Sequence, residues 1–523
     1  MWFWLLACTG GGNDDSPEDS TPVETCVSDT PAAAPTCPDG GGFDNFVTRI
    51  GDQLCEGDAP YRFISFNIPN LHAIEDPEWH IPDPWEQEDA ITSLVQMGGN
   101  VARIYTLSVG VIDQDEDEPV RHVMAPGELN EDLMVALDHA VAKAREQCVR
   151  LIIPLVDQHE YWGGIANYSR FTIDAPSGLS WDEKIQFWEG EFWSDSDVRE
   201  DYWTTVDLLL NRTNTVTEVQ YKNDPTILAW ETGNELEWWI EGEDWTVDQD
   251  QEWTEDIAAR LKELAPNHLV LDGRYGVQEG ALEDDNIDIV SDHYYKRNVD
   301  DANYLASVAP DHQTAQGQKA FLVGEFGFVN PTEMGTMLDA VIDDGMAGAL
   351  IWSLRFHSVN GGFYWHSEGT GGGPPEEEKW AYHWPGFDSG EPSDETEILE
   401  LMREKAFAIR GLEVPAIEAP AAPTILSSNE ALEFVWQGSA GASSYSLERS
   451  ASETGPWVEI KSGFHDAEEP NTALVIDDIE SPETACYYRM RAHNSGGASE
   501  PSAVVGPISK APPEPPDPVE LSL

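Results

Sequence analysis

Basic residues are scarce in this chain. Its 523 residues include 28 Lys and Arg against 98 Asp and Glu, which gives a formal net charge of −70. Nucleic acids and anionic lipid surfaces bind through clustered Lys and Arg, so both are poor partners for such a chain. Polyanionic glycans are disfavoured for the same reason. The charge balance therefore favours a neutral partner and argues against a nucleic-acid-binding function.

Metal-binding cysteine patterns and long apolar runs are also missing. Six cysteines are present without a CxxC pair, so neither a zinc site nor another metal site is expected. One disulfide among Cys26, Cys37 and Cys55 is expected if the protein is exported, whereas Cys148 and Cys486 are expected to be small buried hydrophobic residues. Beyond the first residues, no stretch approaches the roughly 18 apolar residues of a membrane span.

The first residues, MWFWLLAC at positions 1–8, resemble the end of a bacterial lipoprotein signal. The last four match the lipobox, in which Cys8 would carry the lipid, although no Lys or Arg precedes the short apolar stretch. A frayed hydrophobic N-terminus is the alternative. Residues 9–45 are rich in Gly, Pro, Ser, Thr and acids, which predicts a disordered tether. We therefore expect an extracellular or cell-surface protein, either secreted or held to the bacterial outer membrane only by this lipid.

Apolar and aromatic residues are abundant by contrast. Hydrophobic residues make up 40% of the chain, and 20 of them are Trp, enough to build a packed core and to stack against flat, uncharged rings. Between residues 46 and 412 they form eight short runs, separated in places by helical patterns. The runs are residues 61–68, 100–105, 150–156, 227–230, 268–272, 287–291, 320–323 and 347–352.

These eight runs predict an α/β fold of the (β/α)₈ TIM barrel type with long loop insertions. Several runs are apolar throughout, as strands buried on both faces must be. Residues 130–147 have the apolar stripe of an amphipathic helix, with acids in the first turn and bases near the end. A doubly wound sheet is the alternative, but no glycine-rich phosphate-binding fingerprint follows the first strand.

The pattern changes downstream of the predicted barrel. Residues 413–423 form a linker rich in Pro and Ala, and residues 424–508 contain alternating strand patterns without helices. This second region resembles a small all-β fibronectin type III sandwich, with Trp436 as its buried aromatic residue. Residues 509–523 are a Pro-rich acidic tail.

Two glutamates stand where the fourth and seventh strands of such a barrel end. Glu235 follows the run 227–230 in the sequence ETGNE, and Glu325 follows the run 320–323 in GEFG. Active sites of TIM barrels lie at the C-terminal ends of the strands, so the two side chains are expected across one mouth. Glycoside hydrolysis requires such a pair, with one carboxyl as proton donor and the other as nucleophile, at roughly 5 to 5.5 Å in a retaining enzyme.

Longer motifs around these residues resemble glycoside hydrolase family 5, specifically its β-1,4-mannanase branch. They are YKNDPTILAWETGNE and LVGEFG around the two glutamates, with RFISFNIPNLH, GGNVARIYTLS, IDIVSDHYY and LIWSLRFH at other strands, all in the same order. The resemblance covers residues 46–412. It implies a TIM barrel and a retaining, metal-independent endo-β-1,4-mannanase that needs no cofactor.

The resemblance also implies roles for the residues around the two carboxyl groups. Glu235 would be the general acid/base and Glu325 the nucleophile. Arg103 would keep Glu325 ionised, which leaves Glu235 with a raised pKa. Asn234 would bind the 2-hydroxyl of the sugar, and Tyr295 would donate a hydrogen bond to Glu325.

Further residues are expected to bind the sugar or to flank the acid. His293 would lie beside the general acid, and Trp352 would form the floor of the subsite before the scissile bond. The third strand departs from the mannanase pattern, because the chain reads DQHEYW at residues 157–162, where Asn and Trp residues are more usual, so His159 or Trp162 could reshape a subsite. In the long loop after the eighth strand, Trp365 is a candidate stacking platform.

Glu231 and Glu237 are the rival acids near the fourth strand. Glu231 lies within the strand and is expected to be a structural hydrogen-bonding residue, whereas Glu237 could point into a sugar subsite.

The predicted function is hydrolysis of β-1,4-mannosidic bonds in a neutral mannan-type polysaccharide by a monomeric enzyme. An exo-β-mannosidase and a β-1,4-glucanase of the same family are alternatives, because the loop after the eighth strand could leave an open cleft or close one end of it. A non-catalytic glycan-binding or adhesion protein is the alternative from another class. The presence of both Glu235 and Glu325 argues against it.

Overall fold

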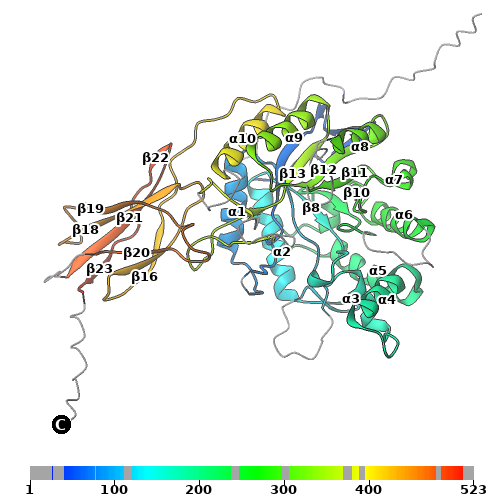
Figure 1. Ribbon diagram of the computed structural model, residues 1–523, viewed down its shortest axis with the longest axis horizontal. Helices are drawn as coiled ribbons and strands as arrows, with labels where there is room; N and C mark the ends of the chain where they lie inside the picture. The colour runs from blue at the N-terminus through cyan, green and yellow to red at the C-terminus, as the bar shows by residue number, and fades with distance from the viewer. Residues whose placement is uncertain are drawn as a thin grey trace, which may run out of the picture.

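The computed structural model shows a barrel of parallel strands wrapped by helices, with a smaller β-sandwich attached at one side (Figure 1). It describes Cys26 and residues 41–76, 78–110, 121–236, 247–295, 306–368, 380–387, 395–478 and 485–510. The predicted lipoprotein signal, with Cys8, lies outside the described residues, as do most of the predicted tether and tail.

Eight parallel strands close the barrel, and each contains residues of one of the apolar runs. In barrel order they are β4 (Phe63–Asn67), β5 (Val101–Arg103), β8 (Arg150–Pro154), β9 (Ile227–Glu231), β10 (Leu269–Asp272), β11 (Ile289–Tyr294), β12 (Ala320–Phe326) and β13 (Gly348–Ile351). Nearly all of their residues are buried, because helices cover the outside and side chains fill the inside. The predicted TIM barrel is confirmed, and the doubly wound alternative is wrong.

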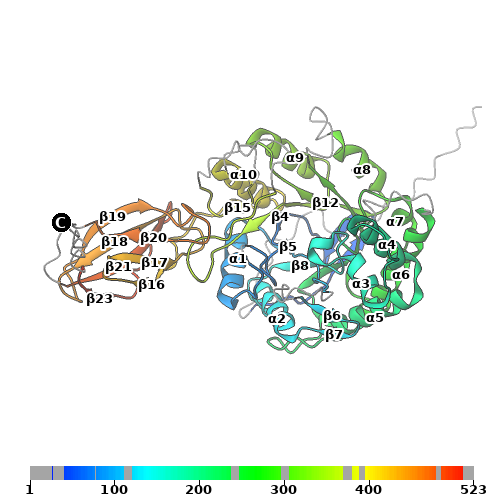
Figure 2. The same ribbon diagram turned by 60° about the horizontal axis from the view of Figure 1, so that its bottom comes forward.

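Helices surround the barrel (Figure 2). They are α1 (Pro84–Gln96), α2 (Glu131–Glu146), α3 (Ile165–Thr172), α4 (Trp181–Ser194), α5 (Ser196–Asn211), α6 (Val247–Leu264), α7 (Glu279–Glu283), α8 (Val308–Ala315), α9 (Pro331–Asp343) and α10 (Glu395–Ala408), with short 3₁₀ turns η1 (Glu160–Trp162) and η2 (Tyr221–Asn223). The helix predicted over residues 130–147 is α2, and Asn130 caps it by accepting a hydrogen bond from the backbone of Asp132. Among the described residues, no helix is long and apolar enough to cross a membrane.

Small sheets accompany the barrel. They are the three-stranded sheet of β1 (Val47–Ile50), β2 (Gln53–Glu56) and β3 (Ala59–Pro60), and the pairs of β6 (Val123–Ala125) with β7 (Glu128–Leu129) and β14 (Leu354–Arg355) with β15 (Tyr382–His383). Val47 and Leu54 of the first sheet pack against Phe63, Val101 and Leu269, residues at the N-terminal ends of barrel strands. The first sheet therefore covers the end of the barrel opposite to the one where catalytic residues are expected.

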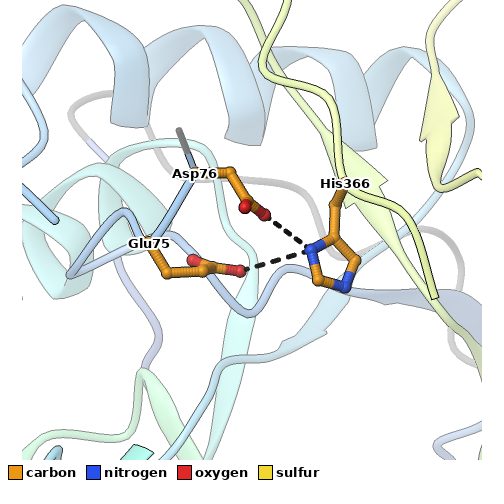
Figure 3. Close-up of side chains that lie close together, drawn as sticks. All are labelled: Glu75, Asp76 and His366. Atoms are coloured by element: carbon orange, nitrogen blue, oxygen red, sulfur yellow. Dashed lines mark hydrogen bonds and ion pairs between the residues drawn. The ribbon is translucent and has the colours of Figure 1, made fainter. Parts of the chain in front are cut away.

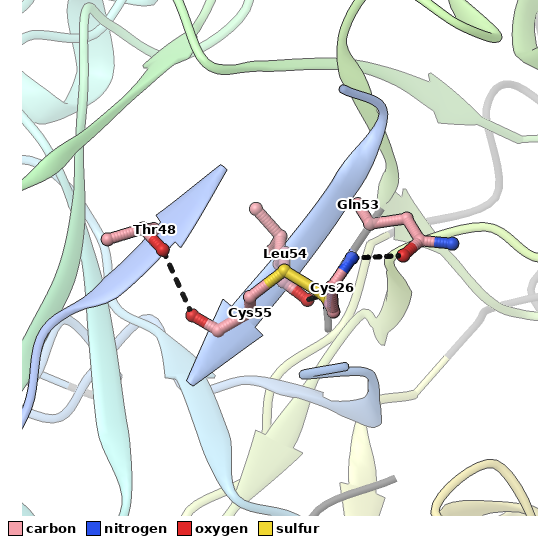
Figure 4. Close-up of a disulfide and its surroundings, with 5 residues drawn as sticks. All are labelled: Cys26, Thr48, Gln53, Leu54 and Cys55. Carbon is pink, nitrogen blue, oxygen red and sulfur yellow. Dashed lines mark hydrogen bonds between the residues drawn. A yellow bond between two sulfur atoms is a disulfide. The ribbon is translucent and has the colours of Figure 1, made fainter. Parts of the chain in front are cut away.

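A disulfide fastens Cys26 to β2. Its partner is Cys55, 29 positions further along the sequence, with the two Cα atoms 5.9 Å apart (Figure 4). Closing a loop of this length stabilises the fold by roughly 3 to 4 kcal/mol in the chain-entropy model. The disulfide predicted among three cysteines is thus confirmed. Cys148 is buried as expected, but it is disulfide-bonded as well, whereas Cys486 is a buried cysteine, as expected, and forms no disulfide.

Residues 424–508 form two packed sheets. One contains β16 (Thr424–Ser428), β17 (Glu433–Gln437) and β20 (Leu474–Ile476), and the other contains β18 (Ser444–Ser450), β19 (Val458–Phe464), β21 (Cys486–Asn494), β22 (Gly497–Ala498) and β23 (Val505–Ile508). Buried and partly buried residues alternate along β17 and β21, and the buried ones, including Trp436, form one apolar cluster between the sheets.

A buried histidine joins the two parts of the molecule. Nδ1 of His357, which follows β14, lies 2.8 Å from a carboxylate oxygen of Asp89 on α1, and its Nε2 lies 3.2 Å from Asp466 of the sandwich. Burial acts to lower the pKa of His357, but the two carboxylates outweigh it and raise the pKa to about 10. The ring is therefore charged at neutral pH and bridges the barrel and the sandwich.

Candidate active site

One pocket opens among the residues that follow the barrel strands. It is lined by Tyr105, His159, Tyr161, Asn234, Glu235, Tyr295, Glu325, Trp352 and Glu368. Six of these were predicted from the sequence as catalytic or substrate-binding residues. Arg103 and His293 lie directly behind the lining, where they contact the two predicted catalytic glutamates.

Glu325 lies near the end of β12 and is 5% exposed. One of its carboxylate oxygens accepts a hydrogen bond from Nη1 of Arg103 at 2.7 Å, and the other accepts from the hydroxyl of Tyr295, also at 2.7 Å. Both contacts are the ones implied by the resemblance to family 5. Two donors fix the orientation of this carboxylate and favour its ionised form.

Arg103, at the end of β5, holds several groups at once. Its Nε and Nη2 donate to the two carboxylate oxygens of Glu231 at 2.6 and 3.0 Å, and Nη2 also donates to Asn234 Oδ1 at 2.7 Å. Nη1 donates to Asn67 Oδ1 at 3.2 Å, in addition to its contact with Glu325. Because Glu231 is bound through both oxygens, it has the structural place that the sequence predicted for it.

Glu235 lies just beyond β9, in a backbone conformation that is rare for residues with a side chain. Its φ is 50°, in the left-handed region. Neighbouring backbone hydrogen bonds hold this turn, because Asn234 N donates to Val156 O and Leu236 N donates to Gly273 O. The turn therefore fixes the direction in which the carboxyl group of Glu235 enters the pocket.

Two histidines bind the carboxylate of Glu235, one on each oxygen. Nδ1 of His293, on β11, lies 2.7 Å from Oε1, and Nε2 of His159 lies 3.0 Å from Oε2. Burial alone would raise the pKa of Glu235, but the two imidazoles outweigh it and hold the pKa well below its ordinary value. The raised pKa expected for Glu235 is therefore wrong for this arrangement, because the sequence did not reveal the second histidine contact.

The pKa of Glu325 moves in the opposite direction. Burial raises it and outweighs the lowering by His293, Arg103 and Tyr295. The guanidinium of Arg103 is shared between Glu325 and Glu231, which limits how far it can lower either pKa.

The two carboxyl groups are close together. One oxygen of Glu235 and one of Glu325 lie within 4.8 Å of each other. Oxygen atoms this close agree with carboxyl groups at the roughly 5 to 5.5 Å of retaining glycosidases, rather than at the roughly 6.5 to 9.5 Å that inverting enzymes use to fit a water molecule between the groups.

Asn234 and Trp352 complete the predicted set in the pocket. The amide of Asn234 donates from Nδ2 to Asp157 at 3.0 Å and to the hydroxyl of Tyr105 at 3.3 Å. Trp352 follows β13 and donates from Nε1 to a carboxylate oxygen of Glu368 at 2.7 Å. These bonds hold an amide and an indole ring at the pocket surface.

Glu368 belongs to a charged cluster beside the pocket. The same oxygen lies 3.1 Å from Nε2 of His366, whose Nδ1 faces Asp76 at 2.6 Å and Glu75 at 3.8 Å (Figure 3). One ligand atom from each of Glu75, Asp76 and His366 lies close enough to the others to share a metal ion. Arg355 also donates to Glu75 at 3.1 Å, so an ion-pair network accounts for the cluster without a metal.

Two predicted substrate-binding residues do not reach the pocket. Trp162 is 1% exposed, donates its indole N–H to the backbone oxygen of Thr106 and packs against Tyr105, so it supports the pocket from beneath. Trp365 packs against Trp380 and His383 within the loop after β14. Both rings are held by neighbouring side chains and do not line the pocket. Trp162 acts on the pocket through Tyr105, and a sugar contact of Trp365 stays a prediction. Glu237 lies outside the described residues.

Three pocket residues were not singled out from the sequence. Tyr105 ends an apolar run and could have been found by the same strand-end rule that found the glutamates. Tyr161, 58% exposed, follows His159 on the loop after β8. Glu368 comes from a long loop with no periodic pattern, and no signal in the sequence brings it to the site.

Comparisons with known proteins agree with this geometry. A family model described as GH family 5 beta-mannosidase-like matches residues 44–311, about half of the chain. The mannan endo-1,4-beta-mannosidase 8 of Oryza sativa subsp. japonica is 33% identical over 250 residues, which are 47% of this chain and 62% of that protein. The mannan endo-1,4-beta-mannosidase 7 of the same organism is 36% identical over 250 residues, with 47% and 60% covered. The chain thus spans about three fifths of the length of these relatives.

Solved structures resemble the barrel. A glycoside hydrolase family 5 mannosidase from Rhizomucor miehei superimposes with a TM-score of 0.54 at 20% identity, over 70% of this chain and 98% of that one. An endo-beta-1,4-mannanase from Thermotoga petrophila gives a TM-score of 0.50 at 19% identity, over 85% and 98%. At these identities the likeness concerns the fold.

Proposed function

Since the chain belongs to the GH family 5 beta-mannosidase-like proteins, we propose that it is a retaining endo-β-1,4-mannanase acting on neutral mannan-type polysaccharides. The observation that carries the proposal is the pair Glu235 and Glu325, which have carboxylate oxygens within 4.8 Å of each other in one pocket. Glu325 lies near the end of β12 and Glu235 just beyond β9. A separation of this size supports double displacement.

In the first half-reaction, ionised Glu325 attacks the anomeric carbon of the sugar. A bond forms between its carboxylate oxygen and that carbon, and the bond to the leaving oxygen breaks as Glu235 gives that oxygen a proton. Arg103 and Tyr295, which donate to Glu325, orient the attacking carboxylate. In the second half, Glu235 removes a proton from water, and the water oxygen displaces Glu325 from the sugar.

A neutral substrate is supported by the charges at the pocket. Besides the catalytic pair, Glu368 lines it and Asp157 lies behind Asn234. These carboxyl groups repel anionic sugars, whereas hydroxyl groups of mannose can donate to them. The mannan-specific names of the similar rice proteins support mannose as the sugar.

An exo-β-mannosidase is the second candidate. The observation in its favour is Glu368, which the loop after β14 brings to the pocket and which Trp352 and His366 hold in place. A side chain fixed there closes part of the pocket, as an enzyme that removes single terminal sugars requires.

The proposal extends to the rest of the chain. We propose that residues 424–508 are a fibronectin type III domain that acts as a spacer, supported by two packed sheets of three and five strands. We also propose export, with or without a lipid on Cys8. The disulfide between Cys26 and Cys55 supports export, because such bonds persist in oxidising compartments.

The test uses the full chain with β-1,4-mannan and, in parallel, cellulose. We expect mannan to yield oligosaccharides, with the β-anomer of the new reducing end appearing first in an NMR time course. A first product of α configuration would contradict the retaining mechanism, and mannose alone would favour the exo-acting candidate. Products from cellulose alone would favour a glucanase, and no new reducing ends from either polysaccharide would favour a binding protein.

A further inference from the structure

The acid side of the pocket contains one histidine more than the resemblance to family 5 implied. His293 was expected beside Glu235 and lies there on β11. His159 reaches the other oxygen of the same carboxylate from the loop after β8, at the start of η1. Glu235 therefore has an imidazole nitrogen on each oxygen, and every proton that it gains or loses changes the charge between two titratable rings.

The two histidines differ in their surroundings. The side chain of His293 is 6% exposed, and burial and the guanidinium of Arg103 act to lower its pKa, but Glu325 and Glu235 outweigh both and raise it. The side chain of His159 is 24% exposed. The titratable groups that face His159 are Asp157 on its own loop, Glu235 after β9, Glu325 on β12, Glu189 on α4 and the ring of Tyr161.

These carboxyl groups favour the charged form of His159. Burial acts to lower its pKa, but Glu235 and Asp157 outweigh burial and raise the pKa to about 9. At neutral pH the resting pair is thus an imidazolium bound to an ionised Glu235, whose own pKa is held low. A general acid needs a proton, and in this pair the proton is bound to nitrogen.

We propose that His159 is a positioning residue that stores the proton which Glu235 delivers to the leaving oxygen. The proposal rests on the proposed function, in which Glu235 is the general acid/base. It adds a proton store to this site that the family resemblance does not assign.

The proton balance closes over one turnover. In the first half-reaction the N–H bond at Nε2 of His159 breaks and an O–H bond forms at Oε2 of Glu235. Glu235 then passes this proton to the leaving oxygen, which leaves His159 neutral and Glu235 ionised. In the second half, Glu235 takes a proton from the attacking water and returns it to Nε2, which restores the resting pair.

The consequence is measurable in the pH profile. The active form of the pair contains one proton, and the pair loses it only as pH rises through the pKa of the His159 and Glu235 couple. The alkaline limb of kcat/KM for mannan is therefore expected near pH 9, the region of the His159 pKa. Without the imidazole the pair loses its proton at lower pH.

The test compares wild-type protein with His159→Gln, which keeps an N–H donor for Glu235 but cannot titrate. We expect the alkaline limb of kcat/KM on mannan to move to lower pH by about one unit or more. His159→Asn, a second non-titrating variant, is expected to move the limb in the same direction. His139→Gln on α2, away from the pocket, is the matched control and leaves the profile unchanged.

A second substrate separates proton storage from structure. The leaving group of 2,4-dinitrophenyl β-mannoside departs without a proton, so kcat/KM for this substrate is expected to fall much less in His159→Gln than kcat/KM for mannan does. A merely structural role of His159 would lower kcat/KM for both substrates by the same factor. An unchanged alkaline limb in both His159 variants, or equal losses on both substrates, would overturn the inference. A wild-type protein inactive on both substrates would instead contradict the proposed function.

Discussion

The two sides of the pocket are built differently. On the Glu325 side, partners come from within or directly after the barrel strands, and Arg103, at 1% exposure, has a charge that does not titrate near neutral pH. On the Glu235 side, the carboxyl group lies on a left-handed turn beyond its strand and binds two histidines. A nucleophile needs one charge state during attack, whereas an acid/base must change its state twice in each turnover. The hydrogen-bond donors of Glu325, Arg103 and Tyr295, therefore suit the first role, although His293 also reaches Glu325 at 3.5 Å, whereas both partners of Glu235 are titratable imidazoles, which suit the second role.

Glu325→Gln is the substitution with the largest expected effect. Without an ionised oxygen no bond to the sugar can form, so kcat/KM on mannan is expected to fall by more than about a thousandfold. The loss should be equally large for 2,4-dinitrophenyl β-mannoside, because a good leaving group does not replace the nucleophile. Glu263→Gln on the exposed face of α6 is a charge-matched control. Wild-type-like turnover in a folded Glu325→Gln protein would remove the basis of the comparison.

Glu235→Gln should show the opposite dependence on the leaving group. We expect a loss of about 10²- to 10⁴-fold in kcat/KM on mannan, the usual contribution of a general acid. On 2,4-dinitrophenyl β-mannoside the loss in kcat/KM should be small, because the first half-reaction then needs no proton. Steady-state kinetics on both substrates measure this. If the two losses are equal, the two sides of the pocket do not have different roles.

Arg103→Lys tests whether the Glu325 side of the pocket depends on the geometry of the Arg103 guanidinium as well as on its charge. Lysine keeps the positive charge but lacks the fork that binds Glu231 through two nitrogens while reaching Glu325 and Asn234. We expect an approximately hundredfold loss of kcat/KM and a loss of about 1 to 3 kcal/mol in the free energy of unfolding, because buried acceptors lose their donors. Activity assays and urea denaturation measure the two effects. An unchanged kcat/KM and an unchanged free energy of unfolding would mean that a positive charge at position 103 is sufficient.

Tyr295→Phe is expected to have the smallest effect, and this effect comes from a changed pH response of Glu325. The Tyr295 hydroxyl donates to Glu325 at 2.7 Å and thereby lowers the pKa of that carboxyl group. Its loss raises the pKa of Glu325, so more of the nucleophile is protonated at a given pH. The acidic limb of kcat/KM should move to higher pH, with an approximately tenfold loss near neutral pH. A movement to lower pH would contradict this assignment.

The sequence predicted the strand-borne part of the site well. Glu235, Glu325, Arg103, His293 and Tyr295 belong to or directly follow barrel strands, and the order of strands in a TIM barrel brings such positions to one mouth. The apolar runs identified the strands, because a strand buried on both faces has no polar alternation to obscure it.

Residues on loops were predicted less well. Trp162 was expected to reshape a subsite and Trp365 to stack on the sugar, but neither ring lines the pocket, because both pack against protein side chains. Glu368 was missed, because it reaches the pocket through a loop whose path no short-range pattern encodes. The same limit applies to the pKa of Glu235, which depends on the loop after β8 placing His159 against it.

The amino-acid sequence by itself determined the barrel, the helix at residues 130–147 and the positions of the two catalytic candidates, because periodicity and capping are local properties of the chain. Only the tertiary structure decided which groups share protons: that Arg103 divides its charge between Glu231 and Glu325, and that two histidines hold Glu235. Electrostatic interactions depend on distances of a few ångströms between residues remote in sequence. Those distances exist only after the loops have packed against the barrel.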